Sequence, residues 1–278
     1  MKGLNLGCGT RFHPEWTNLD ATYVGPHVRI HDVSRGLPFE DETFDTVYHS
    51  HLLEHLPKTA AAPFIQECYR VLKRGGIIRV AIPDLERIAT LYLEALKKAI
   101  TRQPNAKHDY TWAMLELYDQ AVRDKPGGTM LEYLKQEPIP NQELVYERLG
   151  EEARQIVARL SRKDTQNQSD PLRRRWRYRA HFLRDRIRAA LVRGLLGQCD
   201  HAALMVGRFR LSGEIHHWMY DRYSLSLLLE QAGFQTPAER TAFDSSIENW
   251  AQYHLDGDQN GTIYKPDSLY IEANKPAL

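Results

Sequence analysis

The stretch that decides the fold is Leu4-Asn5-Leu6-Gly7-Cys8-Gly9, near the start of the chain. Residues 2–6 have the pattern of a short strand, and the glycines that follow allow the backbone to approach a ligand closely. Further short apolar runs follow, separated by turn residues, at 16–20, 27–33, 44–50 and 77–82. Near-continuous apolar strands joined by crossovers predict a mostly parallel sheet in an α/β fold.

Helical patterns occupy the middle of the chain. Residues 59–73 have one apolar face and lead into Gly75-Gly76, which predicts a helix that stops there, and 85–100 form a longer amphipathic pattern. Strand patterns return only near 235–243 and 268–273, after a helix over 223–232. We therefore expect one α/β domain made of residues 1–85 and 212–278, interrupted by a helical insertion over residues 86–211.

The charge of the chain is balanced overall but not locally. The 278 residues include 37 Lys plus Arg and 36 Asp plus Glu, a formal net charge of +1. Residues 154–210 hold 15 basic and 4 acidic residues, a net +11, so the remainder carries −10. The total argues against a generally basic nucleic-acid protein. The basic block needs a separate explanation.

Other features of the sequence set the compartment. No run of about 18 apolar residues predicts a membrane span, and the N-terminus lacks the pattern of a signal peptide. The three cysteines are far apart and odd in number, which favours a reducing compartment over a disulfide framework. We expect a cytoplasmic protein.

Three candidate ligand positions follow three successive strands. They are the Gly7-Cys8-Gly9 turn, Asp20 and Asp32. Ligands of open α/β sheets bind at the carboxyl ends of the strands, so three such positions together favour a binding site over three separate caps or turns. The dinucleotide fingerprint is not met, because Phe12 stands where its third glycine would be.

An ordered set of motifs resembles a known family. The motifs are 4–9, Asn18-Leu19-Asp20, His31-Asp32-Val33, Leu37-Pro38-Phe39, Phe44-Asp45, His51-Leu52-Leu53-Glu54-His55 and Leu72-Lys73-Arg74-Gly75-Gly76. The sequence resembles a class I S-adenosylmethionine-dependent methyltransferase of the small-molecule type, and more narrowly the bacterial branch associated with surface-polysaccharide pathways. The resemblance covers residues 1–85 and resumes from 216–221 to the last strand at 269–273.

The resemblance implies a Rossmann-like class I methyltransferase sheet with a late antiparallel strand, and S-adenosylmethionine as cofactor. It implies that the first-strand turn passes under the methionine part, that Asp20 holds the ribose, that Asp32 and Val33 border the adenine, and that the exit of the fourth strand lines the methyl-transfer side. The implied cofactor-binding residues are Leu6, Gly7, Cys8, Gly9, Asp20, Asp32, Val33, His49 and Ser50.

Two departures from the family pattern stand out. Asn5 occupies the place of the acidic residue that the family carries in its first strand. Ten residues separate Gly9 from Asp20, which is too few for a full crossover helix with two loops, so the first helix must be very short.

The segment His51-Leu52-Leu53-Glu54-His55 also fits H-x-x-E-H, a zinc-hydrolase pattern. The sequence offers no identifiable third ligand, so no metal site is expected. The competing interpretation is that Glu54 and His55 cap and pack a turn while the leucines enter the core.

Methyl transfer to a hydroxyl needs positioning and a general base, for which histidine is suited at neutral pH. His51, at the exit of the fourth strand, is the first candidate for that base. His216 or His217, oriented by Asp221, is the second, and packing between elements is an equally good explanation for this pair. Asp84 is expected to cap the helix that follows it.

The basic block is centred on Arg173-Arg174-Arg175-Trp176-Arg177-Tyr178-Arg179, which opens a predicted helix to about Leu196. Three partners are open for it. The first is this protein itself, through docking on the acidic body or homo-oligomerisation. The second is an anionic membrane or lipid-linked substrate. The third, and least favoured, is nucleic acid.

The resemblance implies a methyltransferase that methylates a hydroxyl of a sugar, glycan or other small molecule, in surface-polysaccharide biosynthesis, and the basic block predicts peripheral contact at the inner face of the membrane. One alternative is a non-catalytic adaptor that kept the fold. Another is an RNA methyltransferase, which His49-Ser50-His51 disfavours because base-amine enzymes carry Asn/Asp-Pro-Pro-aromatic at that strand exit.

Overall fold

The structure is a computed structural model that describes residues 1–165 and 175–277, and within residues 162–191 it describes no side chains. Seven strands form one sheet in the order β3-β2-β1-β4-β5-β7-β6. Their bounds are β1 (Gly3–Leu6), β2 (Thr17–Asp20), β3 (Val28–Ile30), β4 (Phe44–Ser50), β5 (Leu72–Pro83), β6 (Gln235–Arg240) and β7 (Ser268–Asn274). β7 runs antiparallel to both β5 and β6, whereas the other pairs are parallel. The predicted class I sheet with its late antiparallel strand is confirmed.

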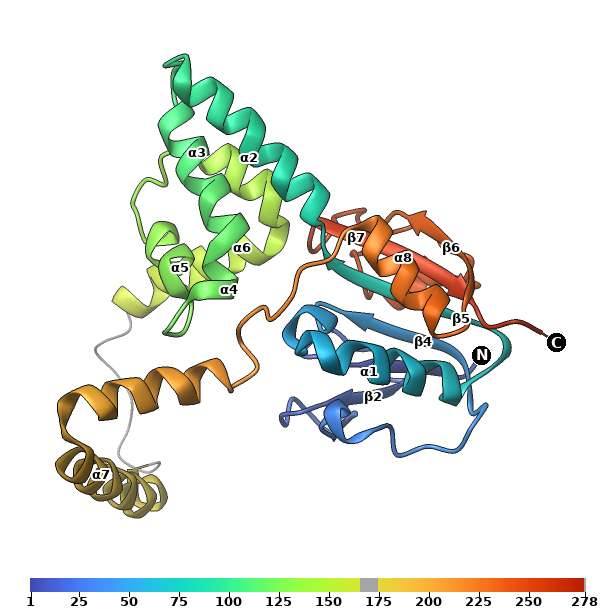
Figure 1. The fold of residues 1–278 in the computed structure, drawn as a ribbon, viewed down its shortest axis with the longest axis horizontal. Helices are drawn as coiled ribbons and strands as arrows, with labels where there is room; N and C mark the ends of the chain where they lie inside the picture. The colour runs from blue at the N-terminus through green and yellow to red at the C-terminus, as the bar shows by residue number, and fades with distance from the viewer. Residues whose placement is uncertain (166–174, 278) are drawn as a thin grey trace.

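The two faces of the sheet are covered differently. On one face, α1 (Lys58–Val71) and α8 (Arg222–Gln231) pack over the strands and bury the main core, which includes Leu6, Phe64 and Leu229 (Figure 1). On the other face a smaller core forms around Trp16, Tyr48 and Trp250, supplied in part by the long loop between β6 and β7 and its short helix η4 (Trp250–Tyr253). Burial on both faces explains why the central strands are almost continuously apolar.

Two local predictions need correction. The helix expected over 59–73 ends at Val71, and the chain turns directly into β5, so Gly75 and Gly76 lie inside that strand at a register irregularity opposite β4. Residues 7–16, all of which the structure describes, contain no helix at all between β1 and β2. The short first helix predicted from the spacing is therefore replaced by a loop.

In the described residues between β5 and α8, the regular elements are helices joined by turns and loops. These helices are α2 (Leu85–Ile100), α3 (Ala106–Met114), the π-helix η3 (Leu115–Asp119), α4 (Gln120–Val122), α5 (Gly128–Leu134), α6 (Gln142–Thr165) and α7 (Arg175–Arg210). α2 begins as expected, because Asp84 Oδ1 accepts hydrogen bonds from the backbone N–H groups of Glu86 and Arg87 at 3.0 and 3.2 Å. α2 to α6 have their own core around Trp112, and Figure 1 shows them gathered beside one end of the sheet.

The basic block lies partly outside the described residues. Arg173 and Arg174 belong to the undescribed segment, and the first part of α7, up to residue 191, is described only as backbone. The helix is interrupted further along, at Gly197. Figure 1 shows α7 lying apart from the sheet, joined to it through the segment that leads into α8. Within the described chain, none of the helices combines the length and apolar character that crossing a membrane requires.

Candidate active site

The site begins at the glycine turn after β1. Gly7 and Gly9 both adopt the left-handed region, with φ of 62° and 50°. The Gly9 backbone N–H donates to Asp20 Oδ2 at 2.9 Å, so the turn is held by the carboxylate that ends β2. A Cβ added at Gly9 would meet no atom within 4 Å. The turn therefore presents open backbone at the carboxyl edge of the sheet.

Two buried asparagines hold the loop that replaces the first helix. Asn5 Nδ2 donates to the Arg11 carbonyl at 3.0 Å and lies 3.3 Å from Asn18 Oδ1. Asn18 Nδ2 in turn donates to the carbonyls of His13 and Trp16 at 3.0 and 2.9 Å. Amide side chains can donate and accept together, so this pair satisfies loop carbonyls that a helix would otherwise have paired internally. Asn5 thus holds the loop in place, at the position where the family that the sequence resembles carries an acidic residue.

A cavity of about 330 Å³ opens over the ends of β1 and β4. Five of the residues predicted for the site line it: Gly7, Cys8, Gly9, Ser50 and His51. The opposite wall comes from the loop before β7, where the Arg11 guanidinium stacks 3.4 Å from the Tyr264 ring centre. Burial, with a smaller contribution from Asp20, raises the pKa of the Cys8 thiol to about 12, so this thiol stays neutral. A neutral thiol has no nucleophilic role here.

The structure places the remaining predicted cofactor residues outside this cavity. Leu6 is fully buried in the core, and Val33 packs against the core as the first residue of η1 (Val33–Arg35). The Asp32 carboxylate caps η1 by accepting from the backbone N–H and hydroxyl of Ser34, and these hydrogen bonds lower the pKa of Asp32. Asp20 lies beside the cavity through its hydrogen bond to the Gly9 amide.

His49 was predicted to line the methyl-transfer side, and the structure places it elsewhere. Its ring is fully buried against Phe64 of α1, with the ring centres 5.2 Å apart, and burial lowers its pKa to about 4. Side chains alternate across a strand, so Tyr48 and Ser50 face the cavity while His49 points to the helix-covered face. The alternation of side chains along β4 could have predicted from the sequence that His49 and Ser50 point to opposite faces of the sheet.

His51 stands at the centre of the site. It follows β4 with φ of 50°, and its side chain is 11% exposed. Its Nε2 lies 2.8 Å from Ser268 Oγ, and its Nδ1 lies 3.2 Å from Glu54 Oε1. Ser268 is the first residue of β7, so this contact joins the end of β4 to the start of β7, and these two strands lie on either side of β5. The sequence did not single out Ser268, which is 217 residues away along the chain.

A second cavity of about 310 Å³ lies between the sheet edge and the helices of the insertion. Its walls include Met130 and Leu134 of α5 as well as His55 and His216. His51, Glu152, Ile156 and Lys265 line both cavities, so they form the partition between them. Lys265 Nζ is 3.4 Å from Glu152 Oε2, an ion pair that links the loop before β7 to α6.

The partition depends on a close approach between the backbone of α6 and the loop before β7. Gly150 breaks α6 with φ of 59°, and a Cβ at that position would lie 2.6 Å from Pro266 Cδ. Only glycine allows both the left-handed conformation and this contact. The part of α6 that follows Gly150 therefore reaches the loop before β7 and supplies Glu152 and Ile156 to both cavities.

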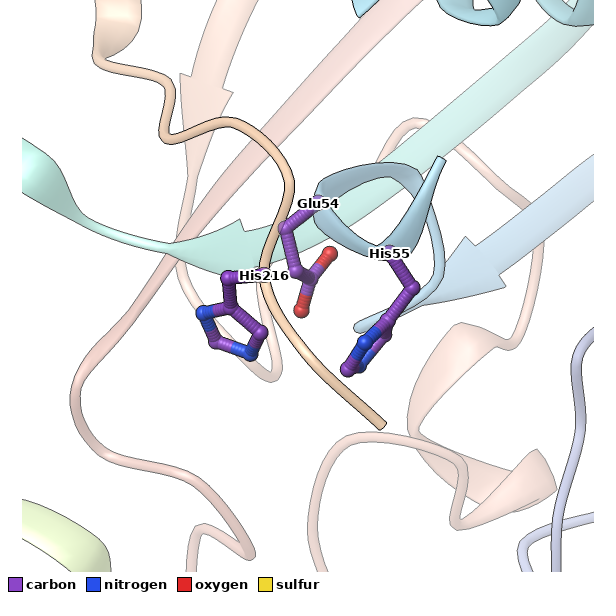
Figure 2. A group of neighbouring side chains, drawn as sticks. All are labelled: Glu54, His55 and His216. Carbon is purple, nitrogen blue, oxygen red and sulfur yellow. The ribbon is translucent and has the colours of Figure 1, made fainter. Parts of the chain in front are cut away.

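Glu54 and His55 lie in the short helix η2 (Leu53–His55), next to the segment that leads into α8. Ligand atoms of Glu54, His55 and His216 all lie within 4.8 Å of one another, and Figure 2 shows the three side chains converging. Burial opposes ionisation of Glu54, but the close contact with His51, with smaller contributions from His216 and His55, outweighs it and lowers the pKa of the carboxyl. Burial lowers the pKa of His216 to about 3 and also lowers that of His55.

The predicted pair of His217 and Asp221 does not form. Asp221 Oδ1 accepts from the Ser224 backbone N–H at 2.8 Å and from its hydroxyl at 2.9 Å, which makes it the N-cap of α8 in a capping box. These bonds from Ser224 lower the pKa of Asp221. The His217 side chain is exposed, and its backbone N–H donates to the Glu54 carbonyl at 2.7 Å. His216, its buried neighbour, is the histidine that reaches the site.

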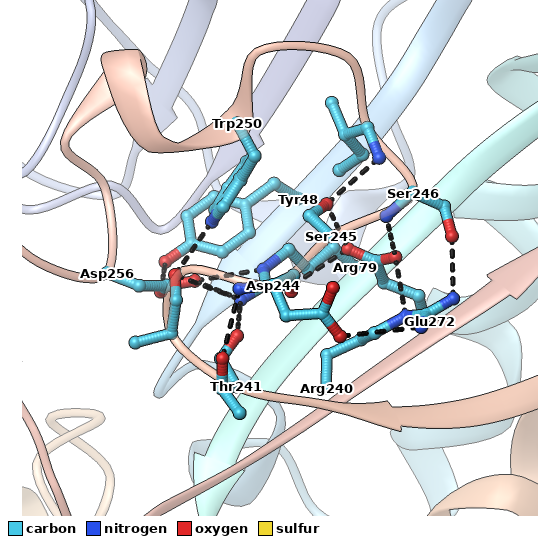
Figure 3. Close-up of polar contacts among 12 residues, drawn as sticks. Tyr48, Arg79, Arg240, Thr241, Asp244, Ser245, Ser246, Trp250, Asp256 and Glu272 are labelled. Carbon is cyan, nitrogen blue, oxygen red and sulfur yellow. Dashed lines mark hydrogen bonds and ion pairs between the residues drawn. The ribbon is translucent and has the colours of Figure 1, made fainter.

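A buried ion network supports the far wall of the first cavity. Arg79 of β5 is fully buried and pairs with Asp256 and Glu272, each at 2.8 Å. It also donates to the carbonyls of Thr241 and Asp244 at 2.7 and 3.1 Å, as Figure 3 shows. Asp256 lines the first cavity and accepts from the Tyr48 hydroxyl. The network thus fixes the loop after β6 against the sheet.

Comparison with known proteins is consistent with this architecture. Residues 15–80 match the family described as "Methyltransferase domain". A stretch of 103 residues is 37% identical to demethylmenaquinone methyltransferase of Streptomyces griseus, covering 36% of this chain and 44% of that protein. The chain thus spans less than half the length of this curated relative.

Solved structures were also compared. A SAM-dependent methyltransferase from Archaeoglobus fulgidus is 12% identical with a TM-score of 0.38, over 99% of this chain and 86% of that one. The YcgJ protein of Bacillus subtilis is 20% identical with a TM-score of 0.26, over 35% of this chain and 51% of that one.

Proposed function

We propose that this protein is an S-adenosylmethionine-dependent methyltransferase that transfers a methyl group to a hydroxyl of a small-molecule acceptor. The observation that carries the proposal is the position of His51 in the partition between two cavities. One cavity lies over the glycine turn, and the other is bounded by the insertion. The match of residues 15–80 to the methyltransferase domain family supports the same class of reaction.

The residues around the first cavity fit the cofactor. When bound, S-adenosylmethionine supplies a methyl group already activated as a sulfonium. The open backbone at Gly9 leaves room for an extended ligand, and Asp20, fixed beside it, offers carboxylate oxygens to ribose hydroxyls. Asn5 cannot replace a carboxylate for the amine of the methionine part, because an amide carries no negative charge; its Nδ2 is engaged with the Arg11 carbonyl.

His51 serves as the general base. Glu54 beside Nδ1 favours the tautomer with its proton on Nδ1, which leaves the lone pair on Nε2. Ser268 Oγ occupies hydrogen-bonding distance of Nε2 and also lines the first cavity. An acceptor hydroxyl that reaches from the second cavity past His51 toward the methyl group would pass its proton to His51 Nε2 through the Ser268 hydroxyl, which lines the first cavity. General bases of this kind contribute roughly 10²- to 10⁴-fold.

The second cavity is the acceptor site in this proposal, and the insertion is its lid. Its mixed lining, which includes Met130, Leu134, His55 and His216, suits a small molecule better than a nucleic acid strand. The name of the Streptomyces griseus relative, a demethylmenaquinone methyltransferase, also favours a small-molecule acceptor. A sugar or glycan acceptor, a role in surface-polysaccharide synthesis, and peripheral membrane contact through the basic block are predictions from the family resemblance.

The test follows labelled methyl transfer from S-adenosylmethionine to separate acceptor pools: nucleotide sugars, lipid-linked glycans, a small-molecule extract and RNA. We expect transfer to one of the first three pools. His51→Gln should reduce kcat by roughly 10²-fold or more and leave cofactor affinity unchanged. His217→Gln, an exposed neighbour outside both cavities, is the matched control.

Two results would contradict the proposal. Cofactor binding without transfer to any pool would favour the non-catalytic adaptor. Transfer to RNA alone, with RNA binding that weakens steeply as salt rises, would favour the RNA methyltransferase.

A further inference from the structure

One cluster in the site has no part in cofactor binding. Glu54, His55 and His216 converge from η2 and from the segment before α8, with all three ligand atoms within 4.8 Å of one another (Figure 2). Glu54 and His216 are buried, with 0% and 5% exposure. The rings of His55 and His216 meet edge to face with centres 4.8 Å apart. His55 and His216 also line the second cavity.

The Glu54 carboxylate has fewer partners than a buried charge requires. Its one close polar neighbour in the described part of the chain is His51, whose Nδ1 lies 3.2 Å from Oε1. Oε2 has no hydrogen-bond partner among the described residues. Buried carboxylates in proteins are paired, hydrogen-bonded or bound to a metal, because an isolated one is very costly. A cation between this carboxylate and two imidazoles would satisfy it.

The backbone around the cluster already orients the imidazoles. His55 Nδ1 lies 3.0 Å from the Ile215 carbonyl, and since a carbonyl only accepts, Nδ1 must carry the ring proton. The Nε2 lone pair of His55 is therefore free for a ligand. The backbone N–H of His217 donates to the Glu54 carbonyl at 2.7 Å, which ties the two segments together. Metal-binding histidines are commonly held by such a hydrogen bond from the other ring nitrogen.

We propose that Glu54, His55 and His216 form a binding site for one divalent transition-metal cation, of which zinc is the best fit. Two imidazoles and one carboxylate are the ligand set of open zinc sites, in which a fourth position holds water or substrate. Magnesium and calcium prefer oxygen ligands only and fit this set poorly. Zinc ligands at about 2.0–2.1 Å in a tetrahedron lie about 3.4 Å apart, so the three side chains close in by roughly 1 Å through side-chain torsions.

His55 and His216 both line the second cavity, so a metal that they hold would be accessible from it. A metal there would bind an acceptor oxygen and lower the pKa of its hydroxyl, which makes the acceptor a better nucleophile for the methyl group. The acceptor would then be a molecule whose hydroxyl can coordinate a metal. This role of the metal rests on the proposed function, whereas metal binding itself does not.

The experiment measures metal binding directly, on full-length protein freed of any affinity tag and of bound metal by a chelator. Zn²⁺, Co²⁺ and Mg²⁺ are titrated separately by calorimetry, and bound zinc is counted after equilibrium dialysis. We expect one equivalent of Zn²⁺, no comparable binding of Mg²⁺, and the visible absorption of four-coordinate Co²⁺. His216→Ala and Glu54→Gln should each weaken Zn²⁺ binding at least tenfold. His217→Ala, one residue away and exposed, should bind zinc like the unaltered chain.

Substoichiometric zinc, or zinc binding unaffected by His216→Ala and Glu54→Gln in variants with an unchanged circular dichroism spectrum, would overturn the site. If one of these variants fails to fold, His55→Gln decides in its place, because His55 is only partly buried. Zinc binding together with absence of methyl transfer would leave the metal site standing and refute the proposed function. Methyl transfer that persists unchanged without metal would refute the role of the metal at the acceptor.

Discussion

Arg79→Met tests how the far wall of the first cavity is held in place. The guanidinium of Arg79 is fully buried between Asp256 and Glu272, and it donates to two backbone carbonyls in the loop after β6. Two carboxylates raise the pKa of Arg79 against the effect of burial. Methionine fills similar space but leaves Asp256 buried without a cation, whereas Glu272 keeps its ion pair with Arg240 at 3.2 Å.

The expected loss of stability is large. Removing one partner of a buried ion network costs about 3–5 kcal/mol. For a chain of this size, each kcal/mol lowers Tm by about 2–4 °C, so Tm should fall by roughly 6–20 °C. Thermal unfolding followed by circular dichroism gives Tm, and urea unfolding gives the free energy. Lys73→Met is the control, because its ion pair with Asp45 at 2.7 Å is largely exposed and worth about 0–1 kcal/mol.

A second change sharpens the interpretation. Asp256→Asn added to Arg79→Met removes the uncompensated carboxylate and should recover part of the lost stability, although alone it should destabilise the protein. A fall of less than 1 kcal/mol for Arg79→Met, or no recovery in the double variant, would refute the view that this network fixes the cavity wall.

Three further predictions follow from single positions. Asp221→Ala removes a helix N-cap and should cost about 1 kcal/mol with kcat unchanged; a tenfold loss of kcat would restore the catalytic role that the sequence suggested. Gly9→Val should weaken S-adenosylhomocysteine binding more than tenfold in calorimetry. The valine side chain would fill the open space beside the turn, and the backbone angle at this position is unfavourable for valine. Unchanged affinity would show that the turn is not part of the cofactor site. Iodoacetamide at pH 8 should label the exposed Cys199 but not Cys8, because burial raises the pKa of the Cys8 thiol to about 12. Mass spectrometry of peptides measures the labelling, and a labelled Cys8 would contradict its burial.

The sheet could be predicted because its strands leave a strong local signal. The central strands are mostly buried on both faces, so they are rich in apolar residues, which polar side chains such as Asn5 and Arg79 interrupt. α2 starts and ends at the predicted residues, since Asp84 caps it and its apolar spacing is regular. The end of α1 was misplaced because Gly75-Gly76 suits a strand irregularity as well as a helix stop.

The site could be predicted only where its residues are local in sequence. The glycine turn, Ser50 and His51 follow directly from strand ends, and all of them line the first cavity. Ser268 and His216 reach the site from more than 150 residues away, through the order of the strands and the return of the chain from the insertion. Nothing in a local pattern distinguishes His216 from His217. Their burial differs because one residue faces the second cavity and the other faces solvent.

Calorimetric titration of the protein with S-adenosylhomocysteine tests the central claim most directly. One site per chain is expected, and Asp20→Ala should weaken it at least tenfold, about 1.4 kcal/mol, because it removes the carboxylate that holds the Gly9 amide and that we propose binds the ribose. Glu40→Ala, an exposed carboxylate before β4, should leave the affinity unchanged. Absence of binding to the unaltered protein, or equal affinity in Asp20→Ala, would contradict a methyltransferase site at this edge of the sheet.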